Sequence, residues 1–127
     1  MNIRNDLVPK TFDEAVALLV TALEDRDVAQ IKAAPNAIRA GTIAHRTVGA
    51  FMVHNWKLAT GDTPLRRDVM HKFDGLGHPG DVVGLIIECT CHLVRQENWN
   101  ITQAVQRSKA HWDRLGRNHD GSAKTGT

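Results

Sequence analysis

Two stretches of the sequence hold the polar side chains that are candidates for binding or for chemistry. Imidazole and carboxylate groups can orient a polar ligand or exchange protons with it. We therefore consider His45 and Asp81 as two walls of a pocket, and as an acid–base or ligand-orienting pair. The candidate ligand-binding residues are two histidines and an asparagine from one stretch, and a histidine and an aspartate from the other: His45, His54, Asn55, His78 and Asp81.

The seven histidines of the 127 residues also raise the question of a metal site. His45 and His54 are nine positions apart, which is about 180° around a helix, so they cannot chelate one ion. Glu88 and His92 are four positions apart and are more simply a surface ion pair. No phosphate loop, dinucleotide fingerprint or nucleophile elbow is present. We therefore predict no metal, no cofactor and no catalytic residue, so that an enzyme is the less favoured class.

The main candidates have structural explanations as well. A buried imidazole needs a hydrogen-bond partner, and His45 would have one if it bonded to a backbone carbonyl or to Asp81. Gly49 lies one turn further on, where glycine costs about 1 kcal/mol relative to alanine in a helix interior, so another helix is expected to cross there. Asp81 at a helix start would satisfy open amides and complement the helix dipole. The packing explanations are the simpler ones.

The elements that must position these residues are all helical in the sequence pattern. Apolar residues recur at helical spacing, and cap residues precede four of the segments: Thr11, Asn36, Thr63 and Asn100. Thr11 and Glu14 form the pattern of a capping box. The predicted fold is all-α, a compact bundle of five to six helices around a long central helix (about 37–58). The other predicted helices are about 12–24, 27–33, 64–73, 81–97 and 101–115.

Length and composition favour one small domain. The chain divides into an extended leader (1–10), a single helical domain (11–116) and a mobile tail (117–127). A formal net charge of +2 is too small to indicate nucleic-acid binding. No signal peptide and no membrane-spanning apolar run are evident, which favours a cytoplasmic protein. Cys89 and Cys91 point about 200° apart on a helix, so they suit neither a disulfide nor a shared metal.

Three short motifs resemble a small helical domain family of unknown function found in bacterial and phage proteins. The resemblance covers about residues 8–95 and leaves the sixth helix and the tail as an extension. His54 stands where the family pattern has an arginine, and Gly80 where it has an acidic residue, so a charge pair at these positions would be lost here. The matching pieces are Pro9-Lys10-Thr11-Phe12-Asp13-Glu14-Ala15-Val16, His45 with Gly49, Asn55 and Trp56, and His78-Pro79 with Asp81 before Ile86-Ile87.

Several functions are compatible with these features. The leading hypothesis is a non-enzymatic binding or inhibitory module that acts through protein–protein contacts and can homo-oligomerise. A phage-encoded inhibitor of host defence is its concrete form, and this form is implied by the resemblance alone. The alternative is a domain that binds a small polar, nucleotide-like molecule around His45, Asn55, His78 and Asp81. A small hydrolase using His45 and Asp81 is the least supported. DNA binding through Arg107, Lys109 and Arg114 of the last predicted helix has similarly little support, because Asp113 and the low net charge oppose it.

Overall fold

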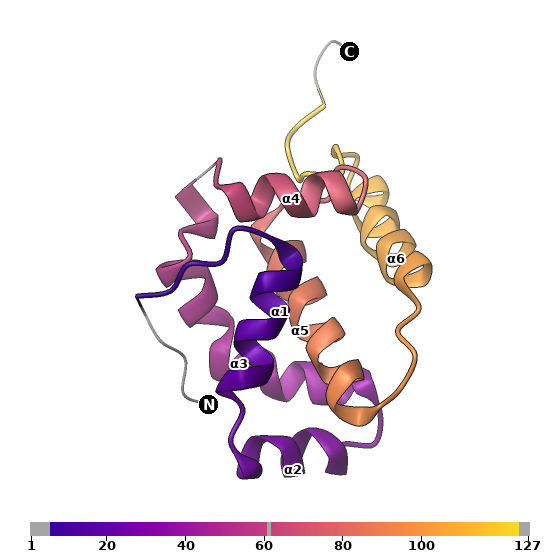
Figure 1. Ribbon diagram of the computed structural model, residues 1–127. Coiled ribbons are helices and arrows are strands. Elements are labelled where there is room, and N and C mark those ends of the chain that lie inside the picture. Colours follow the sequence, from indigo (N-terminus) through magenta and orange to yellow (C-terminus); the bar gives the residue numbers. More distant parts are fainter. Residues whose placement is uncertain (1–5, 61, 125–127) are drawn as a thin grey trace.

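The protein is an all-α bundle in a computed structural model that describes residues 6–60 and 62–124 (Figure 1). Part of the predicted leader (1–5), Gly61 and the end of the predicted tail (125–127) lie outside the described residues. Within the described residues there is no strand, and Arg117 and Ala123 form one isolated β-bridge. The elements are α1 (Phe12–Ala22), α2 (Asp25–Ala33), α3 (Ala37–Asn55), the 3₁₀ turn η1 (Leu58–Thr60), α4 (Pro64–Lys72), α5 (Pro79–Arg95) and α6 (Ile101–Arg114).

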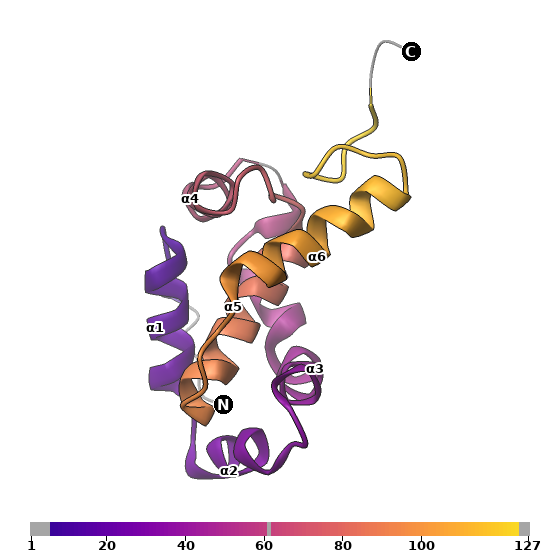
Figure 2. The same cartoon turned by 90° about the vertical axis from the view of Figure 1, so that its right-hand side faces the viewer.

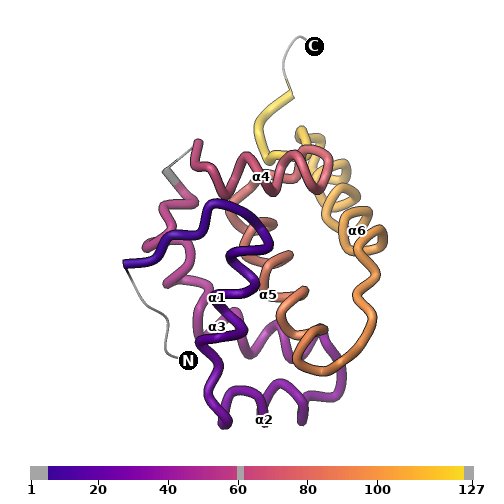
Figure 3. The backbone as a smooth tube through the Cα atoms, viewed as in Figure 1, coloured from indigo at the N-terminus to yellow at the C-terminus, as the bar shows by residue number. Residues whose placement is uncertain are grey.

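The long helix α3 packs on α5, and this pair forms the centre of the bundle. Helix α5 also contacts α1, α2 and α4, which surround the pair, while α6 lies along the flank of α5 in both views (Figures 1 and 2). The tube in Figure 3 shows that α2 and α4 lie at opposite ends of the bundle. The core is apolar, and its largest fully buried side chains include Trp56, Phe73, Leu19, Met52 and Ile86. This burial supplies most of the stability of such a bundle.

The predicted helix caps form, with one correction. Asn36, Thr63 and Asn100 each accept a hydrogen bond from the backbone amide three residues later, as does Thr11. The full capping box at Thr11 does not form. The carboxylate of Glu14 instead accepts from the amide of Lys10 at 2.8 Å. This amide lies outside the helix, so only half of the predicted reciprocal pair caps α1.

Two helices end before their predicted limits because a non-glycine residue adopts left-handed backbone geometry. Lys57 has φ +54°, so α3 stops at Asn55 rather than at Leu58. Gln96 has φ +56°, and α5 stops at Arg95 rather than at residue 97. Left-handed geometry ends a right-handed helix, and it is uncommon in residues other than glycine. The spacing of hydrophobic residues does not predict where such left-handed geometry occurs.

Helix α5 begins two residues earlier than predicted, and this changes the role of Asp81. Pro79 occupies the first helical position, and His78 is the N-cap, whose Nδ1 accepts from the amide of Gly80 at 3.0 Å. Asp81 is therefore the third residue of α5 rather than its cap. Its carboxylate still lies in the first turn, where a negative charge complements the helix dipole.

Candidate functional site

His45 projects from the exposed side of α3. An ideal Cβ added to Gly49 would lie 2.8 Å from His45 Nδ1 and 2.9 Å from Cε1. Gly49 thus leaves room for the imidazole of His45, which lies one turn earlier on the same helix. The sequence suggested instead that Gly49 makes room for a crossing helix. The expected hydrogen bond from His45 to a carbonyl or to Asp81 is absent from the described part of the chain, so this packing explanation was wrong. The imidazole is exposed and lies over its own helix.

His54 and Asn55 lie near the end of α3 and have different surroundings. The amide of Asn55 is half-buried and donates to the carbonyl of Phe51 at 3.1 Å, four residues back in the same helix. This bond holds the Asn55 side chain against its own helix. The imidazole of His54 is exposed, and it lines a groove together with His45.

His78 and Asp81 meet at the start of α5, around a tryptophan from α6. The indole Nε1 of Trp112 donates to Asp81 Oδ2 at 2.7 Å, and the ring centres of His78 and Trp112 lie 4.9 Å apart. A Cβ on Gly121 would lie 2.8 Å from His78 and 3.2 Å from Trp112, so the turn after α6 also packs closely here. The described interactions of Asp81 thus attach α6 to α5, and none of them reaches His45.

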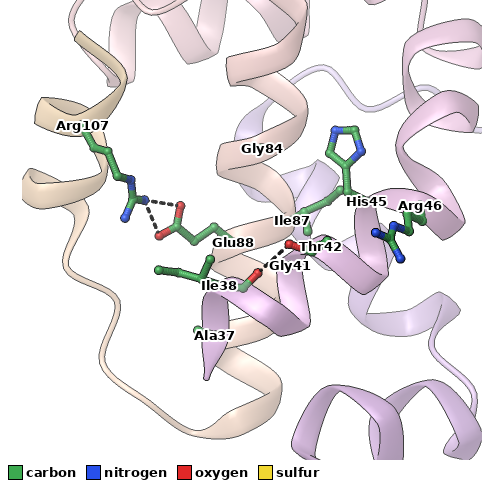
Figure 4. A pocket seen from close by; sticks show the side chains of 10 residues that line it. All are labelled: Ala37, Ile38, Gly41, Thr42, His45, Arg46, Gly84, Ile87, Glu88 and Arg107. Atoms are coloured by element: carbon green, nitrogen blue, oxygen red, sulfur yellow. Dashed lines mark hydrogen bonds and ion pairs between the residues drawn. The ribbon is translucent and has the colours of Figure 1, made fainter. Parts of the chain in front are cut away.

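A pocket of about 510 Å³ lies between α3, α5 and α6 (Figure 4). Its wall is mostly apolar, and two charged residues of α5 and α6 form an ion pair at one side. Arg107 Nη2 donates to both oxygens of Glu88, at 2.8 and 2.9 Å. The lining residues are Ala37, Ile38, Gly41, Thr42, His45, Arg46, Gly84, Ile87, Glu88 and Arg107.

A second hollow of about 560 Å³ continues along α3 and shares His45 and Arg46 with the first. It is also lined by Gly49, Ala50, Val53, His54, Lys57 and Ala59. We call these two connected hollows the α3 groove. The volumes fall within the roughly 300–1,000 Å³ range of small-molecule sites. The long open shape is also what an extended or helical segment of a partner protein requires.

The α3 groove has an uneven charge. Helix α3 contains no aspartate or glutamate, and the groove carries Arg46, Lys57 and Arg107 together with His45 and His54. Glu88 is the one carboxylate among its lining residues, and it is paired with Arg107. Arg46 makes no ion pair or hydrogen bond among the described residues. The groove therefore presents positive charge beside apolar surface, an arrangement that attracts anionic groups.

The described residues hold neither a metal-binding cluster nor an activated thiol. Within residues 6–60 and 62–124, no three His, Cys, Asp or Glu side chains gather closely enough to hold a metal ion. Burial raises the pKa of the Cys91 thiol to about 11, which keeps it protonated and unreactive at neutral pH. None of the described helices is both long enough and apolar enough to cross a bilayer.

Fold and site together define a small all-α domain with an open, basic and apolar groove on its central helix. The chain belongs to the family described as Domain of unknown function (DUF6794), which it matches over residues 8–93. The expected relation to a family of unknown function is thus confirmed. Searches among curated proteins and among solved structures gave no match. The matched segment ends before α6, so Arg107 and Trp112 belong to an extension of the family domain.

Sequence reasoning missed the residues that surround the predicted ones. Arg46 and Gly84 line the groove but were not assigned to a site, and Arg107 was considered only for the poorly supported DNA-binding hypothesis. Two signals were available in the sequence. One is the absence of acidic residues from 37–55, and the other is a glycine in the interior of the predicted helix 81–97, where glycine weakens helices.

Proposed function

We propose that this protein is a non-enzymatic binding module whose α3 groove takes an acidic segment of a partner protein. The observation that carries the proposal is the charge of the groove. Arg46 is unpaired among the described residues, and the single carboxylate in the lining, Glu88, is already neutralised by Arg107. Opposite charge on the partner would steer association and fix its register.

The apolar part of the lining favours a protein partner over a nucleic acid. Ile38 is 67% exposed at the first hollow, and Val53 and Ala50 line the second. A protein segment can place apolar side chains against these residues, whereas a phosphate backbone mainly requires cations. The net charge of +2 supports the same choice. Inhibition would follow if the bound segment belonged to the active surface of the partner. A phage-encoded inhibitor of host defence is one such case.

A second candidate function is the binding of a small anionic molecule in the pocket between α3, α5 and α6. The observation that favours it is the convergence of His45 and Arg46 at the edge of a mostly apolar pocket of about 510 Å³. Native mass spectrometry of gently purified protein separates the two candidates. A retained molecule of defined mass supports the small ligand, whereas an apo mass, as monomer or homo-oligomer, leaves the protein partner as the proposal.

The proposal is tested with a fluorescein-labelled helical peptide of glutamate and leucine that has one central tryptophan, which we call the acidic probe peptide. We expect fluorescence anisotropy to show binding that weakens with added salt, and no binding of a lysine–leucine counterpart. Arg46→Glu should weaken binding about tenfold or more. The matched control is Arg114→Glu, a charge reversal at an exposed arginine of α6 that lines neither hollow. Equal loss in both variants, or equal binding of both peptides, would overturn the proposal.

A further inference from the structure

The first hollow of the α3 groove has a floor that the protein's own packing leaves open. A Cβ added to Gly84, in the interior of α5, would meet no atom within 4 Å apart from the adjacent residues and backbone of its own helix. A Cβ added to Gly41 on α3 would meet Ile87 Cγ2 at 4.0 Å, which is ordinary contact. Steric crowding therefore does not explain either glycine, although glycine weakens a helix interior relative to alanine. Their effect is to leave room above Ile87 for an external group (Figure 4).

Arg107 stands at the α6 side of this hollow with part of its hydrogen-bonding capacity unused. Nη2 makes both bonds to Glu88, and the Arg107 side chain is 52% exposed. Nε and Nη1 have no partner among the described residues. Guanidinium has five N–H donors, so the N–H groups of Nε and Nη1 can donate to a second acceptor while Nη2 stays bonded to Glu88. Figure 4 shows Arg107 and Arg46 approaching the hollow from opposite sides.

We infer that this hollow is the anchor site for one large apolar side chain of the partner, and that Arg107 selects a carboxylate beside it. This inference rests on the proposed function, because the occupant is part of the same acidic partner segment. The apolar side chain would lie over Gly84, Gly41 and Ile87, and the neighbouring aspartate or glutamate would accept from Arg107. Large side chains buried in such pockets carry much of the binding energy at protein interfaces.

Selectivity at this anchor site comes from the extension beyond the family domain. The family match ends at residue 93, and Arg107 lies on α6. Helix α6 buries Ala104 and Trp112 in the hydrophobic core. Side-chain bonds also attach it to the rest of the protein, from Lys109 to Asp74 at 2.6 Å and from Trp112 to Asp81 at 2.7 Å. These bonds fix the position from which Arg107 reaches the hollow.

The experiment compares the acidic probe peptide with two altered forms, one with alanine for its tryptophan and one with glutamine for the glutamates beside the tryptophan. On the wild-type protein, each alteration should weaken binding about tenfold. Gly84→Leu fills the hollow, so it should weaken the unaltered peptide about tenfold and remove the effect of the tryptophan change. Gly84→Ala should have a smaller effect. Arg107→Gln should remove the preference for glutamate over glutamine.

The controls separate this inference from the proposed function. Arg114→Gln on the same helix should keep both preferences, and circular dichroism should show that every variant is folded. If Arg46→Glu abolishes binding while Gly84→Leu and Arg107→Gln bind as wild type does, the result supports the α3 groove as the binding surface and overturns the anchor site. If none of the three variants affects binding, both proposals are wrong.

Discussion

The guanidinium of Arg95 joins the end of α5 to the end of α2. Its Nη1 donates to the carbonyls of Ala34 at 2.8 Å, Ile31 at 2.9 Å and Lys32 at 3.3 Å, and its Nε bonds to Glu97 at 2.6 Å. The side chain is 13% exposed. Because the last carbonyls of a helix have no partner within it, Arg95 supplies the C-terminal cap that the sequence of α2 lacks.

Arg95→Met keeps most of the aliphatic stem and removes the guanidinium. A hydrogen bond to a charged group contributes about 1.5–3 kcal/mol, and a cation at a helix C-terminus adds about 0.3–1 kcal/mol. The two protons of Nη1 serve three carbonyls, so the bonds are not all at full strength. We expect a loss of about 2–4 kcal/mol in the free energy of unfolding. Arg95→Lys keeps the charge without the planar fork and should lose about half as much.

Urea unfolding followed by far-ultraviolet circular dichroism measures this loss. Hydrogen exchange should show the largest loss of protection in α2, because Arg95 caps that helix. Arg114→Met is the matched control, since this exposed arginine has no described partner, and it should change stability by less than about 0.5 kcal/mol. A similarly small effect of Arg95→Met, or a loss of protection spread evenly over the bundle, would refute the reasoning.

Four further predictions concern single side chains. Thr11→Ala removes the side-chain cap of α1 and should lower the free energy of unfolding by about 1 kcal/mol in urea titrations; an unchanged midpoint would contradict it. Trp112→Phe loses the bond to Asp81 and should cost about 1–2 kcal/mol, with increased hydrogen exchange in α6 rather than in α3. Gly84→Ala should raise the thermal midpoint, with a gain of up to about 1 kcal/mol, because its Cβ meets open space. Cys91, with its pKa raised to about 11 by burial, should not react with a thiol reagent at pH 8 until the protein unfolds. Its contribution to stability should be lost as the pH rises from about 9 towards 11, because the unfolded thiol ionises first; rapid labelling of Cys91 in folded protein whose half-buried Cys89 is replaced by serine would contradict the burial.

The helices could be predicted from the sequence because the signals that define them are local. Apolar spacing and side-chain caps such as Asn36 and Thr63 act within a few residues, and the structure has helices where both occur. The ends of α3 and α5 could not be predicted in this way. They depend on left-handed backbone geometry at Lys57 and Gln96, which neither residue type favours.

The site was predicted less well, because its geometry depends on how distant helices pack. His45 and Asp81 were paired as candidates from their chemistry alone. In the structure Asp81 bonds to Trp112, 31 positions away, and Glu88 pairs with Arg107, 19 positions away. Nothing in the sequence around either carboxylate identifies a partner at that distance. His45 does line the groove, but its neighbours there come from α5 and α6.

The most direct test of the proposed function is a nuclear magnetic resonance titration of the ¹⁵N-labelled protein with the acidic probe peptide. We predict that the largest shifts of amide resonances map to the outer side of α3, at Gly41, His45 and Gly49, and extend to Gly84 on α5. Arg46→Glu should greatly reduce these shifts. Shifts confined to other helices, such as α1 and α4, or no shifts at saturating peptide, would contradict the assignment of the α3 groove as the binding surface.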